Sequence, residues 1–232
     1  MNIKNLSKAY PGFLLDNVNL ELFEGDIMGL VGENGAGKTT LIKLLLNLIN
    51  ADKGEILIFG KNYENEEKFI KNKIGIVFDE NYLHELLTAN QFNYIMSQIY
   101  GNWDKNVYYD YLDKFKLPQN VKVKTFSKGM KVKLNFSVAL SVRPKLLILD
   151  EATSGLDPMM RVEILDVIEN YVHQYKCTVL ISSHIFSDFE RIANKITLIH
   201  KGRLIFSDKI SNITQEDSLE NIMSKHIKGD FK

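Results

Sequence analysis

The stretch that decides the fold is Gly32-Glu33-Asn34-Gly35-Ala36-Gly37-Lys38-Thr39, a glycine-framed loop that ends in Gly-Lys-Thr. Its glycines carry no Cβ and can take positive φ, so successive backbone N–H groups can turn inward around phosphate oxygens. Lys38 would add a positive charge there, and the hydroxyl of Thr39 would bind a magnesium ion. The stretch therefore predicts a site for a nucleoside triphosphate.

The residues on either side of the loop support this prediction. Residues 26–31 read as a buried strand, and residues 40–46, which begin at Thr40, read as a helix. A loop in this position lies at a helix N-terminus, where unpaired amides and the helix dipole favour anions. An ordinary glycine-rich turn is the alternative, but the length of the motif and its strand–loop–helix setting argue against it.

Composition limits the fold and the partners. A chain of 232 residues can form one substantial α/β core with a subdomain, and it is too short for two large domains. Lys and Arg together number 29, as do Asp and Glu, so the excess positive charge typical of nucleic-acid binding is missing. No stretch approaches the roughly 18 apolar residues of a spanning helix, and the first residues lack the apolar segment of a signal peptide. We expect one domain, with no nucleic-acid partner and no transmembrane segment.

The hydrophobic pattern divides the chain into three parts. Short strand patterns dominate up to residue 77, and residues 82–141 read as an inserted helical subdomain, in which Thr88 to Gln91 has the form of a capping box. From residue 146, strands and helices alternate, which favours a parallel sheet with helices on its faces. The tail from about residue 208 is polar and predicts a loosely packed helix. The predicted strands are 3–6, 18–22, 26–31, 55–59, 74–77, 146–149, 178–182, 196–200 and 204–206, and the predicted helices are 40–46, 92–100, 105–115, 128–142, 159–175 and 185–193.

A second element that can carry chemistry is the pair Asp150-Glu151, which follows four apolar residues, 146–149. We expect these four to form a buried strand next to the strand of the loop, with the acids at its carboxyl end, where open α/β sheets bind ligands. Asp150 would hold magnesium, and Glu151 would orient or deprotonate the water that attacks the γ-phosphate. A solvated strand end is the alternative when the pair is taken without the loop.

With both elements in place, the chain resembles the nucleotide-binding subunit of an ATP-binding cassette (ABC) transporter over nearly its whole length. Ser154-Gly155-Leu156-Asp157 resembles the family's D-loop, and His184 after Ser182-Ser183 resembles its switch histidine. Phe126-Ser127-Lys128-Gly129-Met130 stands at the signature segment, Tyr10 at the aromatic that stacks on adenine, and Asp79 at the Q-loop glutamine. The resemblance implies an α/β fold: a P-loop NTPase core with a mixed, largely parallel sheet flanked by helices, an antiparallel β subdomain and an inserted helical subdomain.

The resemblance also implies roles for the site residues. ATP would be bound by Tyr10, Gly32, Glu33, Asn34, Gly35, Ala36, Gly37, Lys38, Thr39 and Thr40. Glu151 and His184 would be catalytic, and Thr39, Asp150 and Asp79 would hold Mg²⁺. Ser127, Lys128 and Gly129 would act on the ATP of a second cassette, and Ser154, Gly155, Leu156 and Asp157 would lie at the interface with it.

Three of these positions depart from the family pattern. Asp79 replaces glutamine, which shortens the side chain and adds a negative charge near the metal and the phosphates. Lys128 replaces the first signature glycine and Met130 replaces the glutamine, whereas Ser127 and Gly129 are kept. We expect hydrolysis to be retained.

The partners follow from the same resemblance. Two cassettes, either identical or paralogous, would face each other head to tail and enclose ATP between them. A separate transmembrane permease would hold the chain at the cytoplasmic face of the membrane. It would contact residues 80–87, where Tyr82, Leu83, Leu86 and Leu87 offer apolar side chains.

The leading hypothesis is an ATPase subunit that powers export of a drug, antimicrobial compound or peptide, because the segment Ser127 to Met130 resembles ABC-2-type exporters. A nucleotide-sensing cassette with weak hydrolysis, a soluble cassette ATPase outside transport and a different P-loop enzyme such as a small-molecule kinase are the alternatives. The kinase would not need the segment 154–157 or His184.

Overall fold

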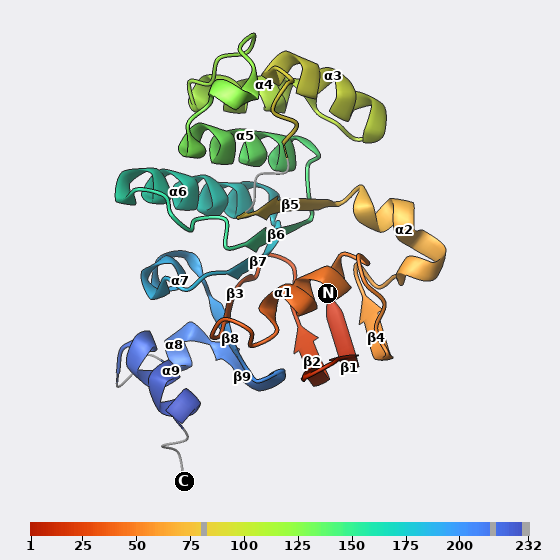
Figure 1. The fold of residues 1–232 in the computed structure, drawn as a ribbon, viewed down its shortest axis with the longest axis vertical. Coiled ribbons are helices and arrows are strands. Elements are labelled where there is room, and N and C mark those ends of the chain that lie inside the picture. The colour runs from red at the N-terminus through yellow and green to blue at the C-terminus, as the bar shows by residue number, and fades with distance from the viewer. Residues whose placement is uncertain (80–82, 214–216, 229–232) are drawn as a thin grey trace.

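A large sheet runs through the middle of the molecule (Figure 1). The computed structural model describes residues 1–79, 83–213 and 217–228. Among them, the strands of this sheet stand in the order β5-β6-β7-β3-β8-β9. All neighbours are parallel except β9, which runs antiparallel to β8. The strands are β3 (Ile27–Val31), β5 (Ile74–Phe78), β6 (Leu146–Asp150), β7 (Thr178–Ser182), β8 (Lys195–His200) and β9 (Arg203–Lys209).

The strand order corrects one expectation. We predicted β6 directly beside β3, but β7 lies between them and pairs with both. All three are fully buried apolar runs, so their composition does not say which one is central. In register, Ser182 of β7 stands opposite Leu30 on one side and Asp150 on the other. The acidic end of β6 therefore still opens at the same edge of the sheet as the loop.

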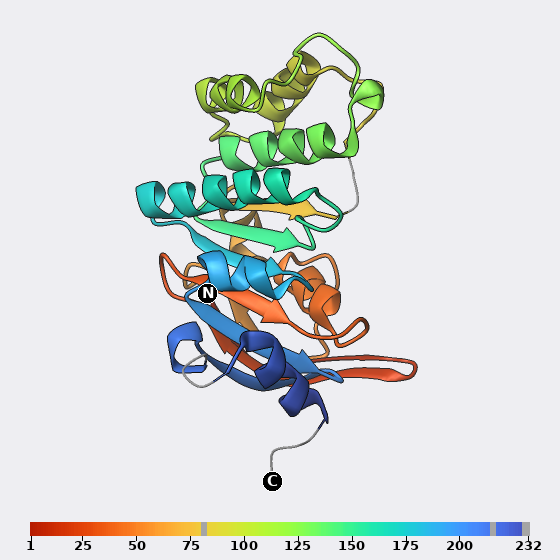
Figure 2. The same ribbon diagram turned by 90° about the vertical axis from the view of Figure 1, so that its left-hand side faces the viewer.

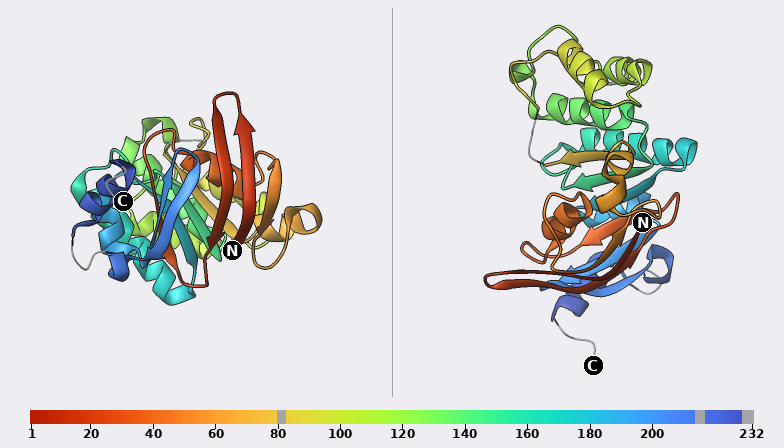
Figure 3. Two further views of the ribbon diagram at one scale, coloured as in Figure 1. Left: turned by 90° about the horizontal axis from the view of Figure 1, so that it is seen from below. Right: turned by 90° about the vertical axis from the view of Figure 1, so that its right-hand side faces the viewer.

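A smaller antiparallel sheet lies beside the large one, in the order β2-β1-β4. Its strands are β1 (Asn2–Tyr10), β2 (Phe13–Glu21) and β4 (Lys53–Leu57), and β1 and β2 are longer than predicted. The β1–β2 hairpin forms a long arm at the edge of the molecule (Figure 3) and turns at Gly12, where φ is +81°. Helix α1 (Lys38–Leu45) shares one apolar cluster with both sheets, through Leu41 and Ile42 of the helix.

The other face of the large sheet packs against α5, α6 and α7. Alternate residues of β6 serve the two faces: Leu147 and Leu149 join this second cluster, and Leu146 and Ile148 join the cluster of α1. The remaining helices are α2 (Tyr63–Lys71), α3 (Ala89–Ile99), α4 (Lys105–Lys114), α5 (Lys128–Ser141), α6 (Pro158–Tyr175), α7 (Phe186–Ile192), α8 (Ile210–Ile213) and α9 (Leu219–Lys228), with a 3₁₀ turn at Val123–Thr125. No helix among the described residues is long and apolar enough to cross a membrane.

Helices α3, α4 and α5 form the end of the molecule farthest from the small sheet, with α5 stacked on α6 (Figures 1 and 2). Side-chain caps begin these helices, and the one at α3 is where the sequence predicted it. Thr88 and Gln91 form a complete capping box at α3. The Ser127 hydroxyl accepts from the backbone N–H of Met130 at 3.2 Å and caps α5.

The C-terminal part is better anchored than expected. We predicted a loosely packed tail from about residue 208, but Leu219 and Met223 of α9 are buried in the cluster of α6 and α7. These two residues are spaced i, i+4, so they lie on one face of the helix. The burial of these two side chains docks α9, although the tail as a whole is polar.

Candidate nucleotide site

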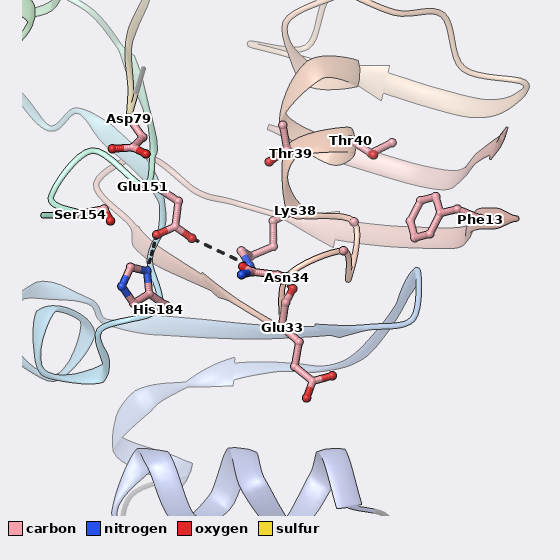
Figure 4. Close-up of a pocket in the computed structure, with 12 residues that line it drawn as sticks. Phe13, Glu33, Asn34, Lys38, Thr39, Thr40, Asp79, Glu151, Ser154 and His184 are labelled. Carbon is pink, nitrogen blue, oxygen red and sulfur yellow. Dashed lines mark hydrogen bonds and ion pairs between the residues drawn. The ribbon is translucent and has the colours of Figure 1, made fainter. Parts of the chain in front are cut away.

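A cavity of about 580 Å³ opens at the carboxyl ends of β3, β6 and β7 (Figure 4). Most of the residues that line it were predicted from the sequence. They are Glu33, Asn34, Gly35, Gly37, Lys38, Thr39, Thr40, Asp79, Glu151, Ser154 and His184, together with Phe13. The fold thus brings together residues from five segments that are far apart in the chain.

The loop between β3 and α1 forms one wall of this cavity. Gly35 and Gly37 have φ of +81° and +114°, a region that L-residues with a Cβ avoid. At Gly32, a Cβ would lie 2.4 Å from the carbonyl oxygen of Ile199. Gly32 and Ala36 do not line the cavity; they shape the loop, and the Ala36 carbonyl accepts from the N–H of Gly202 at 2.9 Å.

Lys38 places a buried positive charge inside the loop. Its side chain is 7% exposed, and its Nζ donates to the carbonyls of Gly32 at 2.6 Å and Glu33 at 3.2 Å. The same Nζ lies 3.9 Å from Oε1 of Glu151. A buried ammonium group facing a polar cavity is suited to binding phosphate.

Asp150 supplies the buried negative charge of the site. Its carboxylate accepts from the Ser182 hydroxyl at 2.6 Å. Burial raises the pKa of Asp150, whereas the hydrogen bond from Ser182 and, more weakly, Lys38 and Thr39 act in the opposite direction. Asp79 lies next to it, because its N–H donates to the Asp150 carbonyl at 2.8 Å.

Glu151 and His184 point toward each other on the side of the cavity that faces Lys38 (Figure 4). His184 Nδ1 lies 2.8 Å from Glu151 Oε2. Glu151 has φ of +53°, and its N–H is held by the carbonyl and hydroxyl oxygens of Ser182, both at 3.1 Å. A left-handed backbone at a non-glycine residue is strained, and such strain clusters at functional sites.

Three residues after Glu151, the segment 154–157 begins, and it leads into α6. The N–H of Ser154 donates to the Glu151 carbonyl at 2.9 Å, and Ser154 lines the cavity. Gly155 has φ of +67°. Asp157 caps α6 by accepting from the N–H of Met160 at 3.0 Å, and Pro158 follows at the first helical position.

The signature segment does not line the cavity of its own chain. Ser127 and Lys128 are exposed at the start of α5, and Gly129 is buried, since a Cβ there would lie 2.2 Å from the Met160 methyl group. Lys128 Nζ reaches to 3.9 Å from Asp79 Oδ1 at the rim. Lys128 and Asp79, which both depart from the family pattern, are therefore neighbours in the fold.

The aromatic residue at the cavity is Phe13, which the sequence analysis missed. Tyr10, which we predicted to stack on adenine, is 43% exposed at the end of β1 and does not line the cavity. Phe13 stands opposite Tyr10 across the two-residue turn, and its ring lies 3.0 Å from the position of a Cβ on Gly37. The sequence did offer a signal for Phe13, because it is a second aromatic residue only three positions after Tyr10.

The loop, the buried Lys38 and the acidic strand end define a P-loop nucleotide-binding protein. The model of the ABC transporter family matches residues 15–154. The chain is 39% identical to the bacitracin transport ATP-binding protein BcrA of Bacillus licheniformis, over 82% of this chain and 63% of that protein. It is 34% identical to the lantibiotic transport ATP-binding protein SrtF of Streptococcus pyogenes, over 98% of this chain and 97% of that one. The chain belongs to the ABC transporter family.

Solved structures agree with this assignment. An ATP-binding subunit of an ABC transporter matches with a TM-score of 0.88 and 26% identity, over 97% of this chain and 98% of the other. A dimeric ATP-binding cassette in a post-hydrolysis state, bound to ADP and phosphate, matches with a TM-score of 0.80 over 90% of this chain and 98% of that one. Its 23% identity supports the fold. The predicted P-loop NTPase core, with its antiparallel and helical parts, is thereby confirmed.

Proposed function

We propose that this chain hydrolyses ATP and powers a separate membrane permease that exports a peptide antibiotic or a similar compound. The single observation that carries the ATPase part is the 2.8 Å contact between His184 and Glu151 in the cavity that Lys38 also lines. It unites a charged phosphate-binding loop with a carboxylate that can act on water. The export part rests on the relatives, whose names assign them to bacitracin and lantibiotic transport.

In this proposal the loop from Gly32 to Thr40 surrounds the phosphates of ATP, with Lys38 as its cation. Thr39, Asp150 and Asp79 hold Mg²⁺, and the donor set fits, because Mg²⁺ prefers hard oxygen ligands and keeps several waters. No cluster of three or more acidic, histidine or cysteine side chains with metal-binding geometry occurs among the described residues, so phosphate and water would complete the shell. A bound Mg²⁺ would neutralise charge that develops on the phosphate oxygens.

Glu151 then orients or deprotonates the attacking water, and His184 holds the carboxylate in place. Since phosphoryl transfer depends mainly on positioning and electrostatics, a fixed Glu151 is the main requirement. The 3.9 Å approach of Lys38 Nζ to Glu151 Oε1 joins the phosphate side and the water side of the site.

The nucleotide-binding site is completed by a second cassette, which is either another copy of this chain or a paralogue. Ser127 and Lys128 are exposed on α5 and lie outside the cavity of their own chain, which supports a role at the ATP of a partner. Ser127 caps the N-terminus of α5. This helix N-terminus would therefore face the phosphates of the partner's ATP. The segment 154–157 would lie at the same interface.

The permease would bind along residues 80–87 and hold the chain at the cytoplasmic face of the membrane. Of the four apolar residues that we predicted for this contact, Leu86 is 58% exposed, Leu83 is buried and Leu87 is half-buried. Tyr82 lies outside the described residues. Leu86 is therefore the side chain best placed to test the contact.

The experiment uses Leu86→Cys for photo-crosslinking through a thiol-linked probe, in a complex purified in mild detergent. The native Cys177 is fully buried, so the new cysteine is the reactive one. Leu48→Cys is the matched control, because Leu48 has the same exposure of 58% and follows α1. We expect Leu86→Cys to crosslink to a multi-span membrane protein and the complex to hydrolyse ATP. Equal crosslinking from both positions, or a complex without ATPase activity, would refute the proposal.

A further inference from the structure

A buried polar network lies between α6 and α7, next to the nucleotide site. Asp188 of α7 is 1% exposed, and its Oδ2 accepts from the Thr153 hydroxyl at 2.7 Å. Burial raises the pKa of Asp188, and the contacts with Thr153, Arg161 and Ser183 oppose this change. An ionised carboxylate in this place needs all the donors that surround it.

Arg161 of α6 is the cation of this network, and one of its hydrogen bonds is missing. An Nη2 N–H donates to the Leu156 carbonyl at 3.1 Å. Its Nε lies 4.0 Å from Asp188 Oδ1, which is too far for a hydrogen bond. Among the described residues, this Nε is the buried side-chain nitrogen that has no hydrogen-bond partner. A buried donor left without a partner is destabilising, because it has lost its hydrogen bonds to water without replacing them.

The network connects three parts of the proposed site. Thr153 follows Glu151 by two residues, and Asp188 follows His184 by four. Leu156 belongs to the segment 154–157. The Arg161 guanidinium contacts the segment that would meet the second cassette and lies beside Asp188, and Asp188 in turn accepts from Thr153. The network as a whole therefore joins that segment to the helix after the histidine and to the residues after the carboxylate.

We propose that Arg161 and Asp188 are positioning residues for ATP hydrolysis, which hold Glu151 against His184 and tie that contact to the segment 154–157. When a second cassette engages this segment, the Leu156 carbonyl shifts Arg161, and its Nε closes the remaining gap to Asp188. Neither residue touches ATP. The inference rests on the proposed function, because it assigns the segment to the interface between cassettes.

The plain alternative is a structural link between two helices, and the molecule contains a matched control for it. Arg191 and Asp166 also join α7 to α6, at 2.5 Å, but their side chains are 40% and 46% exposed and pair with each other rather than with Thr153, Leu156 or Asp188. If the buried pair only holds the helices together, its loss should lower stability and leave turnover per folded molecule unchanged.

The test compares wild type, Arg161→Lys, Thr153→Val and the control Arg191→Gln in the permease complex. Lysine keeps the charge but cannot reach the Leu156 carbonyl and Asp188 together, and valine removes the hydroxyl without changing the volume much. We expect kcat to fall at least tenfold in Arg161→Lys and severalfold in Thr153→Val, with KM and ATP affinity within twofold of wild type. Arg191→Gln should stay within twofold of wild type in all three quantities.

A second readout does not need hydrolysis. Hydrogen–deuterium exchange at 154–157 is measured with and without Mg²⁺ and an ATP analogue that cannot be cleaved. We expect the analogue to protect this segment in wild type and Arg191→Gln, and much less in Arg161→Lys. Equal protection in all variants, or equal kcat for Arg161→Lys and Arg191→Gln, would overturn the inference. A wild type that binds ATP without hydrolysing it would refute the proposed function instead, and the exchange data would then decide this inference.

Discussion

Two polar regions of the molecule differ in how far their side chains are buried. One is the edge of the large sheet where Lys38 and Asp150 lie, called here the phosphate-binding edge, and the other is the start of α5. At the edge, Lys38 and Asp150 are each 7% exposed and contact groups of their own chain. At α5, Ser127 and Lys128 are exposed, and Lys128 Nζ lies beside Gly155 and 3.9 Å from Asp79 Oδ1. Buried charges stay in place only when they are paired, whereas exposed ones gain little from a single neighbour. We infer that the residues of the edge are held in place by their own chain, whereas α5 presents a surface for another molecule.

The largest expected effect is a difference in ATP affinity between variants of two lysines, Lys38 and Lys128. Lys38→Ala removes the buried cation from the loop, and we expect ATP affinity of the isolated chain to fall at least about 100-fold, or ~2.7 kcal/mol. Lys128→Ala, the control, should leave that affinity within about twofold, since its side chain lies outside the cavity. Titration with a fluorescent ATP analogue measures both. Equal losses would abolish the distinction between the two regions.

A mixing experiment tests whether the two regions work in different chains. Glu151→Gln should slow hydrolysis severely while ATP still binds, so that ATP-stabilised dimers accumulate. Ser127→Asp keeps a residue that caps helices well but places a negative charge toward phosphate, which should also suppress turnover. In a head-to-tail dimer of one mutant chain with the other, one site carries both changes and the second site carries neither.

We therefore expect an equimolar mixture of the two variants to recover roughly a quarter of wild-type ATPase activity, if the chains pair at random and sites act independently. The control is a single chain that carries both changes, mixed with an inactive Lys38→Ala chain, which should recover nothing because each site then has a defect. A mixture without activity would argue that both regions serve the same nucleotide within one chain.

The sequence predicted some features of the fold and the site better than others, for physical reasons. A loop such as 32–39 encodes its ligand locally, through glycine φ angles and one lysine, so the prediction needed no tertiary information. The position of β7 between β3 and β6 could not be predicted, because three equally apolar strands can exchange places without changing the local pattern. Phe13 was missed for a similar reason, since a turn of two residues decides which aromatic of the hairpin faces the cavity.

The helical caps, unlike the position of β7 and the role of Phe13, could be predicted from local sequence. Thr88 and Ser127 accept hydrogen bonds from N–H groups three residues on, a distance that sequence spacing fixes. By contrast, the network of Arg161 and Asp188 joins residues 27 positions apart on two helices, and no local pattern announces it. Only the packing of α6 on α7 brings these charges together.

A smaller effect is expected at Asp79, where the two regions meet. Asp79→Gln removes a negative charge beside Asp150 and frees Lys128 from its 3.9 Å contact, so we expect ATPase activity of the assembled complex to rise about threefold, or ~0.7 kcal/mol in the barrier. Asp79→Asn, which removes the charge without restoring the length, separates the two causes. An unchanged rate in both variants would leave Asp79 without a part in the mechanism.

The smallest effect concerns stability and contrasts two carboxylates. Burial raises the pKa of Asp150, whereas the hydrogen bond from Arg143 holds the pKa of Asp104 below its usual value, with the N–H of Val107 adding to this. A lowered pKa in the folded state stabilises the protein above the unfolded-state pKa of about 3.9, and this contribution is lost as the pH falls through the folded-state value.

Asp104→Asn keeps the cap of α4 but removes the ion pair with Arg143, whose Nη2 lies 2.8 Å from Asp104 Oδ2. Because the pair is partly exposed, we expect a loss of only about 0.5 kcal/mol in the free energy of unfolding at pH 7, shrinking toward zero at a pH below the folded-state pKa of Asp104. Urea unfolding at both pH values measures this, with Arg143→Gln and the double variant to complete the cycle. A loss that persists at low pH would mean that packing, rather than charge, holds α4 to the end of α5.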